Sequence, residues 1–301
     1  MKSSFDFDSL SIPVEHQVRI STLNTWHNSD CVPERTSLLC TELQTVQPDI
    51  LCLQEVIFEP DGSSLQLKNI THGSELNIIT ALQQTPSDYH HCSGTAILSS
   101  LHPVESGSFP LGTPTATNDN ASYAVLEHAS GRAIIVITAH LHWGGDKERE
   151  RLVQLTSIDS EAKKLAERYS ALHPMVLLTG DFNTVTDGDA MRFLRGLGSG
   201  SDGSYTRWTD AWESSGTPEN EVTSSPQNHW AQNTARSVGI QLPHMLPHRR
   251  IDYIMSLGWN YGNAGAALRF ERGFDSTAKF GFSTSDHYGL TADFWAPPVP
   301  V

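Results

Sequence analysis

The residues best suited to chemistry are acidic, amide and histidine side chains that stand at, or just after, short apolar runs. They are Asn24, Glu55, His140, His142, Asp181, Asn183, Asp252, Asp286 and His287. Taken singly, each is ordinary, because a strand-end Asn usually forms a turn and a lone His in an apolar strand is usually a hydrogen-bonded core residue. Taken together, in this order, they supply the groups that phosphoester hydrolysis requires.

That reaction needs a hard cation, a base that activates water, and donors that hold the developing charge. Glu55, Asp286 and Asn24 offer the oxygen ligands that such a cation prefers. His287 is a candidate base that directly follows a candidate ligand, and Asp252 is suited to fixing its tautomer.

The remaining polar residues are suited to positioning the reactants. Asp181 and Asn183 are alternate residues after an apolar run, so both side chains can face one pocket. His142 follows His140 by two residues and would share its strand face; an interpretation as a rim histidine is equally compatible with the sequence.

Strand-like and helix-like segments alternate along the chain and must carry these residues. Hydrophobic periodicity predicts helices at 31–47, 74–84, 146–172 and 187–198, and strands at 17–26, 48–56, 94–100, 122–128, 132–143, 174–183, 249–258, 265–274 and 287–295. A hairpin through Ala129–Gly131 is expected between two of these strands. The mixture favours an α/β or α+β fold in layers, with residues 1–301 forming one domain.

The segment 199–248 has little periodicity and is rich in Ser, Gly, Asn, Pro and Trp. A stretch this long without regular structure is usually functional or mobile, so we expect it on the substrate side. Trp230, within this segment, and Arg250, just after it, are candidate substrate contacts, through ring stacking and pairing with a phosphate. Core packing explains Trp212 equally well.

Composition limits the classes of function. The formal charge is 20 − 34 = −14, which opposes tight nonspecific binding to duplex DNA. The four cysteines form no C-x-x-C pair, the first residues show no apolar signal core, and no apolar run is long enough to span a bilayer. We therefore expect a reduced, cytoplasmic protein without a membrane span, and a monomer.

The motifs QEV, AHL, GDFN, RIDYI and SDHYGL stand in this order at residues 54, 139, 180, 250 and 285. Their order and intervals resemble the endonuclease/exonuclease/phosphatase superfamily, with its DNase I-like fold, over residues 17–295. The resemblance implies a four-layered α/β/β/α sandwich with two central sheets and Mg²⁺ or Mn²⁺ at their edge.

By motif, the resemblance also implies roles for the residues. Glu55 is the principal metal ligand, with Asn24 and Asp286 nearby. His287 and Asp252 form a catalytic pair, Asp181 and Asn183 orient the nucleophile and the phosphoryl group, and His140 contacts a phosphate oxygen or assists the leaving group. Many members place an Arg or Tyr against the phosphate in the strand before AHL, and here Tyr123 is the candidate.

Three hypotheses about function remain open. The first is a phosphodiesterase or phosphatase that acts on a small or end-exposed phosphoester, which the acidic charge favours. The second is a nuclease, or an enzyme that processes DNA ends like the tyrosyl-DNA phosphodiesterases. A nuclease requires one basic groove, for which the candidates are Lys147, Arg149, Arg151, Arg249 and Arg250. The third is an inactive binding module, which the complete set of polar residues argues against.

Overall fold

Two six-stranded sheets lie face to face at the centre of the molecule. The computed structural model describes residues 12–83, 92–112 and 120–299, and the first residues searched above for a signal core fall outside these ranges. In spatial order, the first sheet consists of β11 (Ala267–Gly273), β12 (Gly289–Trp295), β1 (Gln17–Asn24), β2 (Ile50–Phe58), β4 (Cys92–Ser99) and β3 (Asn77–Gln83). The second consists of β5 (His102–Pro110), β6 (Asn120–Glu127), β7 (Ala133–His140), β8 (Met175–Asp181), β10 (Asp252–Leu257) and β9 (Trp208–Asp210).

Each sheet has one parallel pair of strands joined by a helical crossover. The strands β1 and β2 are parallel and flank α1 (Val32–Val46), while β7 and β8 are parallel and flank α3 (Glu148–Arg168). The other paired strands run antiparallel, including β12 beside β1 and β10 beside β8. Both sheets are therefore mixed.

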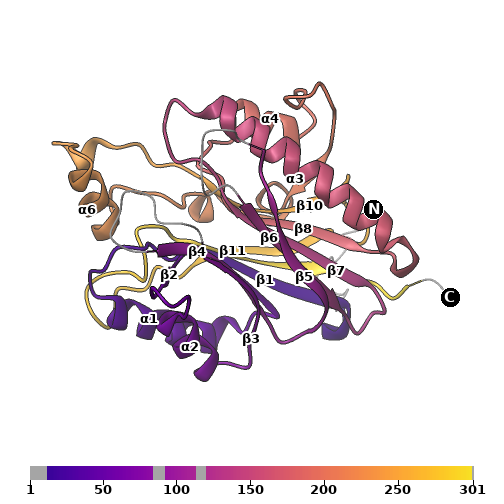
Figure 1. The fold of residues 1–301 in the computed structure, drawn as a ribbon, viewed down its shortest axis with the longest axis horizontal. Helices are drawn as coiled ribbons and strands as arrows, with labels where there is room; N and C mark the ends of the chain where they lie inside the picture. The colour runs from indigo at the N-terminus through magenta and orange to yellow at the C-terminus, as the bar shows by residue number, and fades with distance from the viewer. Residues whose placement is uncertain (1–11, 84–91, 113–119, 300–301) are drawn as a thin grey trace, which may run out of the picture.

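Helices cover the two outer faces, so the molecule has four layers. Figure 1 shows α1 and α2 (Leu65–His72) on one side of the sheets and α3 and α4 (Asp189–Leu194) on the other. Separate apolar clusters fill the space under each helical layer and the space between the sheets. This arrangement confirms the expected α/β/β/α sandwich.

Alternation along the strands decides which residues enter the space between the sheets. Val18 and Ile20 of β1, like Ile134 and Val136 of β7, belong to the cluster between the sheets. Ile135 and Ile137 of β7 instead pack under α3. Because side chains alternate with a period of two, every second side chain of a strand points between the sheets up to the end of that strand.

The segment predicted as a helix at 74–84 forms the edge strand β3 instead. Ile78 and Ile79 are β-branched residues with strand preference, and β3 is half-exposed, so its apolar spacing did not separate helix from strand. The prediction also omitted α2, β5 and α6 (His229–Ser237). The other predicted strands and helices are present, and so is the hairpin between β6 and β7.

The segment 199–248 holds more regular structure than its composition suggests. It contains β9, α5 (Ala211–Ser215), α6 and two 3₁₀ turns, Pro218–Asn220 and Pro243–Met245. Two further 3₁₀ turns lie at Val14–His16 and Ser170–Leu172. Among the described residues, no helix is both long and apolar enough to cross a membrane.

Candidate active site

Five strands each place a polar side chain at the same edge of the sandwich, on the face that points toward the other sheet. The pairs Asn24–Gln54 and His140–Asp181 stand opposite each other across the parallel strands, and Asp252 stands opposite Asp181. Each continues the alternation that points toward the other sheet. Because the carboxyl ends of parallel strands share an edge, residues far apart in sequence meet here.

A polar layer lies directly beneath these side chains. Gln54 is fully buried, and its Nε2 donates to the hydroxyl oxygen of Thr138 at 2.9 Å and of Thr22 at 3.0 Å. These bonds join β1 and β2 of one sheet to β7 of the other. Gln54 therefore fixes the spacing of the two sheets below the cluster and is satisfied without a ligand.

Glu55 reaches the cluster because β2 is irregular at this point. The register of β2 against β4 shifts between Leu53 and Val56, and Glu55 has a left-handed φ of 55°. Such a bulge turns one side chain away from its regular alternation. The carboxylate accepts a hydrogen bond from Asn24 Nδ2 at 2.9 Å, and the same nitrogen donates to Asp181 at 3.0 Å.

His27 is a member of the cluster that sequence reasoning did not select. Its Nδ1 contacts a Glu55 carboxylate oxygen, and its backbone N–H donates to the same oxygen at 3.0 Å. The signal that could have found it is its position three residues after Asn24. Contact with Glu55 outweighs burial and raises the pKa of His27 above its ordinary value.

Arg35 holds the loop that carries His27. It lies in α1, is 1% exposed, and donates to the carbonyls of Thr25 at 2.7 Å and Asn28 at 2.6 Å. Its guanidinium also stacks on Trp26. Burial lowers the pKa of Arg35 to about 10, and the acidic cluster nearby partly offsets that change.

His287 and Asp252 form a buried pair. His287 Nδ1 lies 2.8 Å from Asp252 Oδ2, and its Nε2 lies 3.8 Å from Asp181 Oδ2. Burial alone lowers the pKa of His287, but the two carboxylates outweigh burial and raise it well above its ordinary value. With Nδ1 bonded to Asp252, the Nε2 atom of the ring faces Asp181 and the centre of the site.

Asp181, Asn183 and His140 form one wall of the site. His140 Nε2 lies 3.6 Å from Asp181 and 3.7 Å from Glu55. Asn183 has a left-handed φ of 52°, and its side-chain amide donates to the Leu141 carbonyl at 3.0 Å. Burial, followed by the charge of Asp252, raises the pKa of Asp181.

Asp286 is held by α6 and by its own loop. Thr234 Oγ1 donates to Asp286 Oδ2 at 2.8 Å, and Ser285 Oγ lies 3.3 Å from Oδ1. The Ser285 hydroxyl also donates to the Asn24 carbonyl at 2.5 Å, which ties this loop to the end of β1. Burial, with a smaller contribution from Glu55, raises the pKa of Asp286.

Three of the predicted substrate contacts occupy other places. Tyr123 lies on the outer face of β6, packs under the helical layer and donates to Glu105 at 2.6 Å. The structure does not bring Tyr123 to the cluster, because odd-numbered residues of β6 face α3 and not the other sheet.

Arg250 is not free to bind a phosphate. It is 6% exposed, pairs with Asp210 at 2.6 Å, and stacks on Trp212 and Tyr253. Its charge is already paired in the core, so the structure does not bring Arg250 to the cluster. Trp212 serves as packing beneath it.

Trp230 is a buried packing residue next to the site. It is 4% exposed, its indole N–H donates to the Ser283 carbonyl at 2.8 Å, and its ring lies against Trp26 and Phe282. The structure therefore places the Trp230 ring in the protein interior and not at an exposed stacking surface. His142 is half-buried in the loop after β7, where its backbone N–H donates to Gln154 at 3.1 Å.

Comparison with known proteins agrees with this geometry. The sequence profile of the Endonuclease/Exonuclease/phosphatase family matches residues 21–287, which extend from the end of β1 to His287. The chain belongs to this family. Together, the family and the cluster of acids and histidines make it a phosphoester hydrolase.

The individual relatives described next are all less than 30% identical to this chain. Protein angel homolog 2 of Danio rerio is 28% identical over 209 residues, which are 64% of this chain and 36% of that protein. The chain thus spans about a third of the length of this curated relative. The fold is similar to that of D. rerio TDP2 complexed with single strand DNA product, with a TM-score of 0.69, 19% identity, and coverage of 92% of this chain and 98% of that one. Truncated Caenorhabditis elegans TDP2 is similar with a TM-score of 0.67, 17% identity, and coverage of 93% and 98%.

Proposed function

We propose that this protein hydrolyses small or end-exposed phosphoesters with the help of Mg²⁺ or Mn²⁺. The observation that carries the proposal is the cluster itself. Four carboxylates and three histidines converge at one edge of the sandwich, and the four acids are Glu55, Asp181, Asp252 and Asp286. A buried excess of acids is costly unless a cation or protons neutralise it.

The residues fit a hard divalent cation. Asp252 Oδ1 is buried without a hydrogen-bond partner, although Oδ2 of the same carboxylate is bonded to His287. Asp181, Asp252 and His287 also offer ligand atoms within 4.8 Å of one another. We assign Glu55 and Asp286, whose carboxylate charges interact at the same edge, as the residues that hold the ion, and Asp181, Asp252 and His287 to the proton transfers beside it. When bound, the ion neutralises a nonbridging phosphate oxygen.

Asn24 supports this site as a donor. Its amide nitrogen faces Glu55 and Asp181, while its oxygen accepts the Trp26 N–H at 2.9 Å. We therefore assign Asn24 to holding the two carboxylates apart and in place, which refines the expectation that it is itself a ligand.

The chain's own residues supply the proton transfers and the donors. Asp181 lies between His140 and His287, and the raised pKa of its carboxyl suits it to accept the proton of the attacking water. The protonated His287, oriented by Asp252, donates to a phosphoryl oxygen. We assign His140 and Asn183 to the phosphate and the leaving oxygen, because both stand on the same wall as Asp181.

The structure disfavours a general duplex nuclease. Of the five basic residues expected to form one groove, Arg151 and Arg250 are buried. Arg151 donates to the carbonyls of His142 and Gly144, and Lys147 pairs with Glu150 at 3.3 Å. These residues do not form a continuous exposed basic surface.

Processing of nucleic-acid ends is the second candidate. It is supported by the likeness to D. rerio TDP2, whose structure holds a single strand DNA product. An end presents few phosphates, so a net charge of −14 opposes its binding less than that of a long duplex. An inactive binding module is disfavoured, because every residue of the cluster is present.

We further propose that residues 1–301 act as a single domain and a monomer, because both sheets of one chain contribute to the site. The cytoplasm is the compartment that we propose, since all four cysteines are free thiols.

A substrate panel with Mg²⁺ and with Mn²⁺ tests the proposal. The panel contains single-stranded and duplex DNA, RNA, 5′-tyrosyl DNA, sphingomyelin, inositol phosphates and nucleotide esters. We expect turnover of small or end-exposed esters, and loss of turnover after chelation. Equal hydrolysis by metal-free and metal-loaded protein contradicts the cation's role, and preferred internal cleavage of closed circular duplex contradicts the substrate class.

A further inference from the structure

A cavity of about 260 Å³ is lined by residues from the end of β2, the start of α1 and the loop that follows His27. The strand β2 continues past Glu55 to Phe58, where it pairs with Cys92 of β4. Ile57 stands two residues after Glu55 in β2, which is about 7 Å along a strand. Ser29, on the opposite side, stands two residues after His27 in the loop that Arg35 holds.

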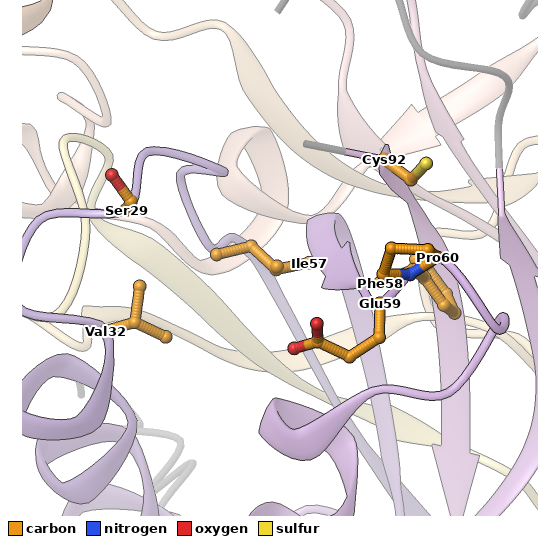
Figure 2. Close-up of a pocket in the computed structure, with 7 residues that line it drawn as sticks. All are labelled: Ser29, Val32, Ile57, Phe58, Glu59, Pro60 and Cys92. Carbon is orange, nitrogen blue, oxygen red and sulfur yellow. The ribbon is translucent and has the colours of Figure 1, made fainter. Parts of the chain in front are cut away.

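The walls of this cavity are mainly apolar. Figure 2 shows Val32, at the start of α1, on one side and Phe58 and Pro60 on the other, with Ile57 between them. Glu59 is the one charged residue among the described residues that line it, and none of these carries a positive charge. The charge of Glu59 therefore opposes a further phosphate group here, whereas the apolar side chains favour an uncharged group.

The size of the cavity also limits its occupant. Pockets for small molecules measure about 300–1,000 Å³, so this one holds a group of one or two rings and not a folded chain. The phosphate of the same molecule would lie at the cluster, where the family's chemistry takes place.

We propose that this cavity is a subsite for an uncharged, apolar end group of one or two rings carried by the phosphoester. The inference rests on the proposed function and narrows its substrate class: one side of the phosphate bears such an apolar group. A substrate that continues as a charged polymer on that side does not fit.

Two phosphonates that cannot be hydrolysed test the subsite by direct binding. Benzylphosphonate and methylphosphonate are titrated calorimetrically into the full chain in the presence of Mn²⁺ or Mg²⁺. We expect the wild type to bind benzylphosphonate about 10- to 100-fold more tightly, because the ring leaves water for an apolar cavity. Equal affinities in the wild type overturn the proposal.

Variants then locate the preference. Val32→Trp fills the cavity and should remove the benzyl preference, whereas Val104→Trp, a matched change at an exposed position of β5, should keep it. Ile57→Ala removes an apolar side chain from the cavity wall and adds no bulk, so it should reduce the benzyl preference severalfold. This variant provides the test if Val32→Trp does not fold. A benzyl preference that survives both changes overturns the proposal.

The result also separates the subsite from the proposed function. If the substrate panel is hydrolysed but the two phosphonates bind alike, the subsite is wrong and the phosphoesterase stands. If no panel substrate is hydrolysed and neither phosphonate binds, the proposed function fails and the subsite fails with it.

Discussion

Among the described residues, three of the seven non-glycine residues with left-handed backbone lie at the site. Trp26, Glu55 and Asn183 have backbone φ values of 57°, 55° and 52°, in a region that residues with a Cβ rarely adopt. Each costs of order 1 kcal/mol or more and persists because the surroundings fix it. For Glu55 the reason is visible: the bulge turns its carboxylate toward Asn24 and His27.

At this scale, His287→Ala should abolish turnover. The change removes the N–H donor between Asp252 and Asp181, and loss of a positioned donor or general acid–base group costs about 10²–10⁴ in rate. The measurement is kcat on the best panel substrate, with thermal melting to confirm the fold. His244→Ala, at an exposed histidine, is the matched control. Near-normal hydrolysis by His287→Ala contradicts the assigned role.

Glu55→Gln should weaken the dependence on the cation. The amide keeps the shape of the side chain and removes the charge that we assign to holding the ion, so the cation concentration for half-maximal rate should rise at least tenfold. Glu127→Gln, at an exposed position of β6, is the control and should leave the titration unchanged. The measurement is a Mg²⁺ titration after EDTA treatment. An unshifted midpoint in Glu55→Gln argues that another residue holds the ion.

At the scale of elements, the two parallel pairs deliver the chemistry. The strands β1, β2, β7 and β8 end at one edge, and β10 and β12 begin there because they run antiparallel to β8 and β1. Six segments separated in sequence thus contribute to one cluster. The remaining strands widen the sheets and supply the core.

The helix α6 positions the loop that carries Asp286 and His287. Asn228, its N-cap, donates to the Ser285 carbonyl at 2.9 Å, Trp230 donates to Ser283, and Thr234 donates to Asp286. Orientation of ligands by such outer contacts typically changes metal affinity 10- to 100-fold.

Thr234→Val should therefore lower cation affinity about tenfold, and Thr234→Ser should restore it. Valine matches threonine in shape but lacks the hydroxyl that holds Asp286. The measurement is Mn²⁺ binding by electron paramagnetic resonance, which does not depend on turnover. Identical Mn²⁺ affinities for wild type, Val and Ser variants rule out a positioning role for Thr234.

Gly180 lets β7 and β8 approach each other below the cluster. Its φ is 135°, and a Cβ at this position would lie 2.0 Å from the Ala139 carbonyl oxygen. Gly180→Ala should destabilise the fold by more than about 3 kcal/mol, because backbone on both sides must move. Gly145→Ala meets no atom within 4 Å and should change stability by less than about 0.5 kcal/mol. Urea unfolding measures both variants, and equal midpoints contradict the argument.

At the scale of the whole molecule, the charge of −14 and the buried acids lead us to expect that stability depends on the proposed cation. An ion that binds the folded chain at about 100 times its Kd stabilises it by about 2.7 kcal/mol. We expect Mg²⁺ or Mn²⁺ to raise Tm by several degrees relative to EDTA, and Glu55→Gln to lose most of that rise. Differential scanning calorimetry provides the measurement, and a rise of equal size in both proteins assigns the ion to another site.

Much of the fold could be predicted from the sequence because the strands are strongly apolar. The buried runs ILCL in β2 and MVLL in β8 are short and are preceded by Pro48 and Pro174, which favours a strand over a helix. The charged helix α3 has a clear apolar stripe. Strands at the edge of a sheet lack such strongly apolar runs. The strand β3 is half-exposed, which is why its spacing was taken for a helix.

The core of the cluster follows from the sequence, since strand alternation and strand ends are local properties. Asn24, His140, Asp181 and Asp252 lie where that reasoning puts them. Tyr123, Trp230 and Arg250 do not, because whether an exposed-looking residue meets solvent, a partner or a core depends on which segment packs against it.

The sequence by itself therefore determined the family, the layered fold and the phosphoester chemistry, because these depend on residue types in order along strands. Tertiary structure alone decided that His27 contacts Glu55, that α6 holds Asp286, and that Arg250 forms an ion pair with Asp210. The physical reason is that each of these contacts joins residues from loops or helices whose mutual distance no local pattern specifies.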